Sequence, residues 1–417
     1  MHSRIVRLIV LGVILLMALP VAALAQTSRV EGMALQGDYI KDYTGIYGYP
    51  SQIGNVGNLI YGELGVAVGG VPVDRSVGTV MGDWWEGRFG TFGVHLRQIT
   101  PQFGQGDATS SPNPGIFGSD PNTNTQEQFD LMWGRKMGTA NFGLRFHRSN
   151  GQVEIGNNFL GLGNISSLKF DFTQLDPNLS RNVMGLGVGL GWEMSPSTNL
   201  EVAGHYQSRS FELTDTLGTT IAEDDGKTTY QLLARAFWQW QPNVMVVPVF
   251  KWYSYDLSTA TGPTIASNHQ NGWQLGAAGN WTIGSNDLFV LGATFAQNRI
   301  EHEADIFAVG FANGEISETF TPQLFAALET HVNSWLTLRF GANKGAWHSV
   351  EVTDNSTPGT LTIHDSPFAM SLGAGVKVGG LQLDAVMNDS FPHNGLYFVS
   401  GASTSPLFSK VTATYSF

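Results

Sequence analysis

The strongest constraint in this sequence is a regular alternation of apolar and polar side chains over segments of about ten residues. The clearest segment is the last one, FSKVTATYSF, which ends the chain. One face of an extended strand there would carry Val411, Ala413, Tyr415 and Phe417, and polar side chains would occupy the other face. This pattern predicts a strand that crosses a membrane within a β-barrel, with its apolar face towards lipid and its polar face towards the lumen.

Further segments repeat the pattern, with Trp and Tyr concentrated near their ends as in interfacial girdles. They are NVMGLGVGLGWE (182–193), TYQLLARAFWQW (229–240), GWQLGAAGNWTIG (272–284) and WLTLRFGA (335–342). Strands of soluble β-sandwiches alternate too, but they usually span ~5–6 residues, and these segments are longer. We therefore expect an all-β protein, an antiparallel up-and-down transmembrane barrel.

The connections between the segments alternate between short and long, as in outer-membrane barrels. We expect short turns near 138–139, 195–199, 241–243, 284–286, 333–334 and 379–380. We expect long loops at about 99–126, 150–181, 214–227, 257–269, 302–315, 351–362 and 389–407. Hairpins counted back from Phe417 give about sixteen strands, with fourteen as the alternative, and the first three near 58–68, 77–86 and 88–98. Pro248 cannot donate to a ladder, so it predicts a bulge or kink.

Composition agrees with an exported membrane protein. Residues 1–25 have the charges, apolar run and Ala23-Leu24-Ala25 cleavage site of a secretory signal, and no later window matches a membrane helix. Charged residues make up only 13% of the chain, against ~25% in ordinary soluble domains. The absence of cysteine excludes disulfides and thiol catalysis. A formal charge of −12 argues against a nucleic-acid partner.

Alternation also assigns many charged side chains to the lumen, because charges on the lipid face cost ~2–4 kcal/mol at the midplane. They form either a salt-bridge and water network or a surface that selects solutes or docks a plug. The predicted set is His95, Arg97, Asp130, Lys136, Arg145, His147, Glu201, His205, Arg209, Arg235, Glu329, His331, Arg339, Lys377 and Asp384. Several glycines share this face, which indicates either close approach of another backbone or local curvature. They are Gly185, Gly187, Gly189, Gly191, Gly276, Gly373 and Gly375.

We find no motif for catalysis, for a cofactor or for a resident metal. Ser, His and Asn all occur, but none lies in a nucleophile elbow. The acidic stretches HEAD (302–305) and AEDDG (222–226) fall in expected external loops, where they are either solvated or bridge lipopolysaccharide through Ca²⁺. The sequence therefore predicts a protein that is not an enzyme.

The segment GMALQGDYIKDYTGIYGYPSQIGNVGN (32–58) breaks the alternation, so we do not expect a wall strand there. Its order and spacing resemble the start of long-chain fatty-acid transporter barrels, the FadL-like family. In that family the segment folds inside the barrel as a hatch, and hydrophobic substrates move through the lumen. The resemblance implies hatch roles for Gly37, Tyr39, Tyr43, Tyr47, Tyr49 and Pro50. Tyr49 and Ser51 depart from the family's N-P-A turn.

The expected organisation is a signal peptide (1–25), a hatch or plug (26–57) and a transmembrane barrel (58–417). The favoured function is a channel for small, hydrophobic molecules in the outer membrane of a Gram-negative bacterium. The alternatives are a general porin for polar solutes and a structural or secretion-associated barrel. Expected partners are outer-membrane lipid or lipopolysaccharide and the barrel-assembly machinery, because the ending at Phe417 resembles its recognition signal.

Overall fold

The computed structural model describes residues 28–65, 76–82, 87–97, 127–154, 178–214, 219–261, 264–284, 286–306, 311–354, 360–387 and 407–417. Four short helices come first: α2 (Ser28–Glu31), η1 (Gly37–Tyr39), α3 (Gly45–Gly48) and η2 (Pro50–Asn55). The strand segments that follow are β1 (Leu59–Gly65), β2 (Ser76–Met81), β3 (Thr91–Arg97), β4 (Glu127–Met137), β5 (Ala140–Glu154), β6 (Asn178–Ser195), β7 (Thr198–Thr214), β8 (Thr220–Gln241), β9 (Val244–Thr261), β10 (Thr264–Ile283), β11 (Asp287–Ile306), β12 (Phe311–His331), β13 (Leu336–Gly345), β14 (His348–Asp354), β15 (Thr360–Asp365), β16 (Phe368–Val378), β17 (Leu381–Met387) and β18 (Phe408–Ser416).

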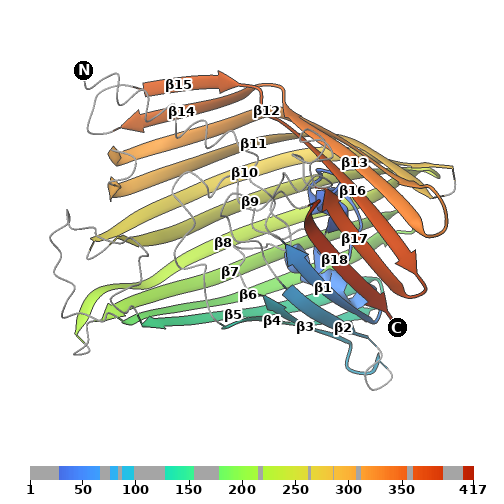
Figure 1. The fold of residues 1–417 in the computed structure, drawn as a ribbon, viewed down its shortest axis with the longest axis horizontal. Coiled ribbons are helices and arrows are strands. Elements are labelled where there is room, and N and C mark those ends of the chain that lie inside the picture. The colour runs from blue at the N-terminus through green and yellow to red at the C-terminus, as the bar shows by residue number, and fades with distance from the viewer. Residues whose placement is uncertain are drawn as a thin grey trace, which may run out of the picture.

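Antiparallel pairing joins these segments into one closed ring (Figure 1). The ring closes where β1 pairs with β18, from Leu59↔Ser416 to Gly65↔Lys410. β12 pairs with β13 along one half and with β14 along the other, while β13 pairs with β16 and β14 with β15. β13 and β14 are thus one interrupted strand, and so are β15 and β16. Counted this way, the described residues form the all-β, sixteen-stranded barrel that the sequence predicts.

The interruptions lie side by side in the wall. Between β14 and β13, the Thr321 amide donates to Trp347 O and the Gly345 amide to Pro367 O, both at 2.9 Å. The β11–β12 ladder shifts register between Thr294 and Ala296. Two prolines, Pro322 and Pro367, lie in this band and lack the amide that a regular ladder needs.

The bulge expected at Pro248 is absent. The β9–β10 ladder runs through Pro248↔Ala277 without a shift. On the other side, Arg235↔Val249 and Trp238↔Val246 belong to the same register. The β8–β9 pairing skips Ala236 and Phe237, opposite Pro248 and Val247, but the register is kept because the unbroken β9–β10 ladder holds β9 in place.

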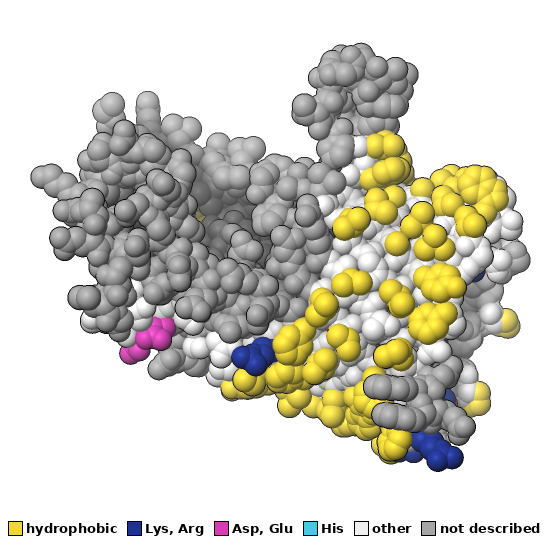
Figure 2. Space-filling model, turned by 60° about the horizontal axis from the view of Figure 1, so that its bottom comes forward, with side chains coloured by type: hydrophobic (Ala, Val, Ile, Leu, Met, Phe, Trp, Pro, Cys, Tyr) yellow, Lys and Arg dark blue, Asp and Glu magenta, His cyan; other side chains and the backbone are white. Residues whose placement is uncertain are grey.

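The outer face of the wall is apolar, as the alternation predicts. In β6, exposed and buried residues alternate from Met184 to Trp192. The large apolar side chains that face outward include Leu186, Leu190, Leu232, Trp238, Leu275, Leu291, Leu328, Leu338 and Phe340. Figure 2 shows a broad surface on which hydrophobic side chains dominate and the charged ones lie at its edges. Such a belt needs lipid rather than water around it.

No helix among the described residues has the length and apolarity to cross a membrane.

Most strands are longer than the sequence predicts. β8, for example, has 22 residues and contains most of the loop expected at 214–227, including the acidic stretch 222–226. Residues 302–306 likewise belong to β11. Hairpin ladders extend past the apolar band because paired strands satisfy each other's backbone groups whatever their side chains. The short turns lie as predicted, with Gly138 and Gly379 at positive φ (64° and 60°). The leader and the loop at 99–126 fall outside the described residues.

Candidate functional site

Residues 28–57, which we call the N-terminal segment, touch strands from opposite parts of the ring. α2 contacts β16, β17 and β18; η1 contacts β9; and η2 contacts β3 through β7. A segment with such contacts lies within the ring, and Figure 1 shows it enclosed by the strands. Its short helices have no side-chain caps, so wall contacts rather than local propensity fix its shape.

An apolar core joins the first half of the segment to the wall. Val30, Met33, Leu35, Tyr39 and Ile40 supply the segment's part of this core. The wall's part comes from the inner faces of β8 to β12 and comprises Phe237, Val247, Val249, Ala278, Val290, Phe325 and Ala327. The rule that polar residues face inward therefore fails on this arc, because the lumen there is filled with protein and not with water.

Glycines on the inner wall allow the segment's backbone to come close. A Cβ at Gly341 would overlap Met33 O, and one at Gly143 would overlap Pro50 O. At Gly189 it would lie 2.7 Å from the Ser51 amide, and at Gly373 it would lie 3.0 Å from the Gly32 Cα. Of the two interpretations of the glycine-lined face, close approach applies at these positions. It does not apply at Gly187, whose nearest neighbour is the ring of His205.

Polar wall residues bind the segment through its backbone carbonyls. The Arg145 guanidinium donates to Tyr47 O at 3.0 Å, and His205 Nε2 lies 2.8 Å from Gly48 O. Arg235 Nη1 donates to Asp38 O at 2.9 Å. These bonds give buried carbonyls of an irregular segment the partners that a helix or sheet would otherwise supply.

Asp130 anchors one polar cluster. Its fully buried carboxylate accepts from Arg145 Nη2 at 2.7 Å and contacts His95 Nδ1 at 3.2 Å and His147 Nδ1 at 3.1 Å. These groups come from the neighbouring strands β3, β4 and β5, which pair in that order. The Asp130 cluster thereby fixes the arginine that holds Tyr47 O.

Glu201 anchors a second cluster. It accepts from Arg235 Nε at 2.8 Å and from Gln52 Nε2 at 3.0 and 2.9 Å. The Arg235 guanidinium also stacks 4.0 Å from the centre of the Tyr49 ring. This cluster joins η2 to β7 and β8 in the buried interior.

A third set of polar contacts ties the start of the segment to the strands around the closure of the ring. Ser28 Oγ and Thr412 Oγ1 lie 2.8 Å apart, and Arg29 Nη2 lies 2.8 Å from Glu329 Oε1. Arg339 binds both Glu329 and Asp384 at 2.6 Å.

Burial also shifts the ionisation of groups on the segment. It raises the pKa of the Glu31 carboxyl, and the nearby Lys410 only partly offsets this. Burial, with a smaller contribution from Asp42, holds the pKa of the Tyr43 hydroxyl well above its usual value. Burial therefore shifts the ionisation equilibrium of both groups towards the uncharged form.

Most of the predicted lumen residues lie together in these clusters. The buried ones are His95, Asp130, Arg145, His147, Glu201, His205, Arg235, Glu329, Arg339 and Asp384. Lys136, His331 and Lys377 occupy inward-facing alternate positions of their strands, but they are exposed. They lie at strand ends beside the short turns. Arg97 and Arg209 lie in β3 and β7, and their side chains are outside the described part of the structure.

Of the residues assigned to the hatch, Gly37, Tyr39, Tyr47, Tyr49 and Pro50 are buried, and Tyr43 is half-buried. Their role as a hatch remains a prediction.

Sequence reasoning missed several interior charges. Lys251 pairs with Asp38, and Lys410 pairs with Glu63. Parity along each strand would have placed Lys251, Lys410 and Glu63 on the inner face. Nothing in the sequence indicated that Asp38, in the irregular segment, would meet Lys251.

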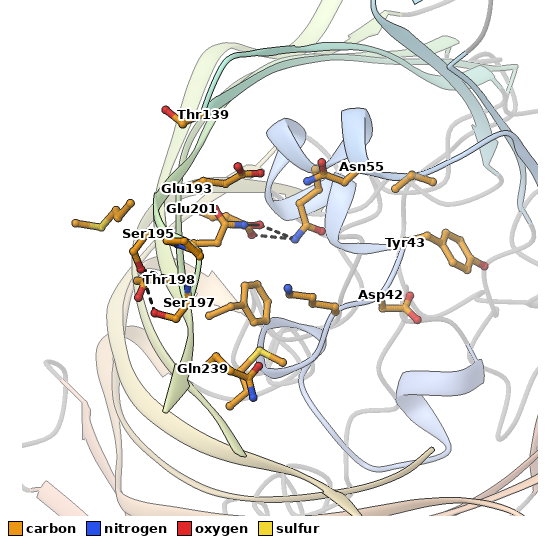
Figure 3. Close-up of a pocket in the computed structure, with 18 of the residues that line it drawn as sticks. Asp42, Tyr43, Asn55, Thr139, Glu193, Ser195, Ser197, Thr198, Glu201 and Gln239 are labelled. Carbon is orange, nitrogen blue, oxygen red and sulfur yellow. Dashed lines mark hydrogen bonds between the residues drawn. The ribbon is translucent and has the colours of Figure 1, made fainter. Parts of the chain in front are cut away.

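A cavity of about 1130 Å³ lies between the segment and the end of the barrel with the short turns. In Figure 3, Asp42, Tyr43 and Asn55 border it from the segment, and Glu193, Ser195 and Gln239 from the wall. Glu201 and Gln52 also line it, so the second cluster borders the cavity. Among the described residues, no group of three or more His, Asp or Glu side chains is arranged so that it could hold a metal ion.

The fold and interior define a transmembrane β-barrel with a segment of its own chain inside. No protein-family model matches the sequence, and no curated protein matches it. Solved structures that it resembles include one described as "CymD monoaromatic hydrocarbon channel" (11% identity, 94% of this chain and 98% of that one, TM-score 0.39). A second is a Pseudomonas aeruginosa FadL homologue (12% identity, 94% and 98%, TM-score 0.39). A third is the Ralstonia pickettii toluene transporter TbuX (10% identity, 94% and 97%, TM-score 0.37).

One of these structures is thus described as a homologue of FadL.

Proposed function

We propose that this protein is an outer-membrane channel for small hydrophobic molecules and that residues 26–57 are its hatch. The observation that carries the proposal is the buried N-terminal segment, which is bonded to the wall on several sides. Tyr39 bonds to β11 through Thr294, Gln52 to β7 through Glu201, and Ser28 to β18 through Thr412. A segment bonded to the wall on several sides occupies part of the lumen, which supports a gated channel over an open porin.

The outer-membrane location is supported by the apolar outer belt and by the secretory leader in the sequence. Assembly there would use the terminal strand. Tyr415 and Phe417 are exposed with their rings stacked 6.4 Å apart, and this supports Phe417 as a contact for the barrel-assembly machinery. Lipid or lipopolysaccharide would surround the belt.

The test is transport by the full chain in liposomes. We expect labelled toluene to enter faster with the protein than without it, and single-channel conductance to stay low. Deleting residues 32–56 should raise conductance, because the deletion removes the segment that fills the lumen. Gly204→Ala, which meets no atom within 4 Å, is the matched control.

A large, steady conductance in the intact protein would favour the general porin instead. Uptake equal to that of protein-free liposomes would reject transport altogether and leave a structural or secretion-associated barrel.

A further inference from the structure

The charged residues that line the cavity beside the N-terminal segment differ in whether they have an ion-pair partner. Each acid that lines it has a cation beside it: Asp42 lies 3.0 Å from Arg29, which also binds Glu329, and Glu201 lies 2.8 Å from Arg235. Glu193 lies 2.6 Å from Lys136. The negative charges of this cavity are therefore neutralised by residues of the wall and segment.

Lys41 also lines the cavity, and its charge is not neutralised in this way. Its side chain is exposed, and its ammonium lies 5.0 Å from the centre of the Phe237 ring. Among the described residues no carboxylate forms an ion pair with it. Lys41 is thus a lining cation without an ion-pair partner among the described residues, and an aromatic face holds it near the wall.

The remaining lining has two kinds of surface. Val56, Met194 and Met245 contribute apolar groups, and methionine side chains adapt to varied shapes. Thr139, Ser195, Ser197, Thr198, Asn55 and Gln239 contribute hydroxyl and amide groups. A neutral hydrocarbon would cover these polar groups without bonding to them, which costs binding free energy.

We propose that this cavity binds a small amphipathic anion, with its anionic group on Lys41 Nζ and its apolar body against Met194, Met245 and Val56. The inference rests on the proposed channel function and narrows its substrate class to organic anions such as aromatic carboxylates. A carboxylate bound here would lie at the turn end of the barrel, separated from the deeper interior by the Gln52–Glu201–Arg235 cluster. The cavity is then the last binding site before release.

The test compares three probes with one ring: benzoate, neutral toluene and benzylammonium. Calorimetry on the full chain in detergent or nanodiscs would measure each Kd for the wild type and for Lys41→Gln, Lys41→Arg and Lys344→Gln. Lys344 is exposed and lies outside the cavity, so its variant is the charge-matched control. Unchanged heat-modifiable mobility would show that each variant is folded.

We expect benzoate to bind more tightly than either other probe. Lys41→Gln should weaken benzoate about fivefold, the upper range for a solvent-accessible charge pair, and leave toluene unchanged. Lys41→Arg and Lys344→Gln should retain benzoate binding. Equal benzoate affinity in Lys41→Gln and wild type, or tighter binding of benzylammonium, would overturn the proposal.

The two proposals fail separately. If toluene enters liposomes through the protein but benzoate affinity is the same in wild type and Lys41→Gln, only the cavity assignment is rejected. If no probe enters but benzoate binding depends on Lys41, the channel is rejected and the site stands.

Discussion

The N-terminal segment meets the barrel very differently on its two sides. Beside the closure of the ring, its first residues are bonded to the wall with little space between, through Ser28–Thr412, Arg29–Glu329 and Glu31–Lys410. Beside the turns that follow β4, β6 and β8, a cavity of about 1130 Å³ lies next to the segment, while η2 still packs closely on β5 and β6. The Gln52–Glu201 contact borders this cavity. We therefore expect the segment to be held more firmly on the closure side and to move more readily where it borders the cavity.

The largest effect should come from the closure side. Glu329→Gln removes the shared partner of Arg29 and Arg339, so Arg339, which is 4% exposed, keeps only Asp384. Because Arg29 keeps Asp42, no charge is left unpaired, and weakening the charge-assisted hydrogen bonds of two arginines should cost about 3 kcal/mol in the free energy of unfolding. Urea titration in lipid vesicles would measure the loss. A change below ~1 kcal/mol would show that this side is not the firm anchor.

A smaller loss is expected where the segment backbone touches a glycine. Gly143→Ala would place a methyl group on Pro50 O, and η2 must move away from β5. Overpacking of this kind costs about 1–3 kcal/mol. Limited proteolysis of the segment should become faster than in Gly204→Ala. Identical proteolysis in the two variants would contradict a close fit at η2.

The cavity side should respond in conductance more than in stability. Gln52→Leu removes two hydrogen bonds to Glu201, at about 2 kcal/mol, while Arg235 still neutralises the carboxylate. We expect more frequent channel openings at a modest cost in stability, measured by single-channel recording. Unaltered gating would show that the Gln52–Glu201 contact does not control channel opening.

The smallest effect should come from Ser28→Ala. It deletes a single hydroxyl contact with Thr412, and a neutral hydrogen bond contributes about 1 kcal/mol. If the closure side acts as one unit, Ser28→Ala combined with Glu329→Gln should exceed the sum of the two single losses. Strict additivity in urea titration would instead describe independent contacts.

Much of the wall was predictable because a barrel repeats one local rule. Alternation alone placed ten of the predicted polar residues in the buried interior, including Asp130, Arg145 and Glu201. It erred where neighbours override the pattern. The long ladders of β8 and β11 are held by pairing, and β9 has the apolar residues Val247 and Val249 on its inner face, where the segment packs against it. Lys377 occupies an inward-facing alternate position, but it is exposed because it lies at the end of its strand.

The interior was only partly predictable. The break in alternation at 32–58 and the inward glycines indicated a segment and a face that a backbone could approach. The partners of each residue were not indicated, because contacts such as Ser28–Thr412 join positions 384 residues apart. The cavity and the position of Lys41 without an ion-pair partner among the described residues depend on how the segment packs among the turns, and no local pattern records this.

The sequence by itself determined that this chain forms an all-β barrel of about sixteen strands with an apolar belt, because strand period and lipid solvation act residue by residue. Tertiary structure alone decided which charges meet, where β13 and β15 are interrupted, and where space remains inside. Those outcomes depend on side chains brought together from opposite parts of a closed ring, and ring closure is a property of the whole chain.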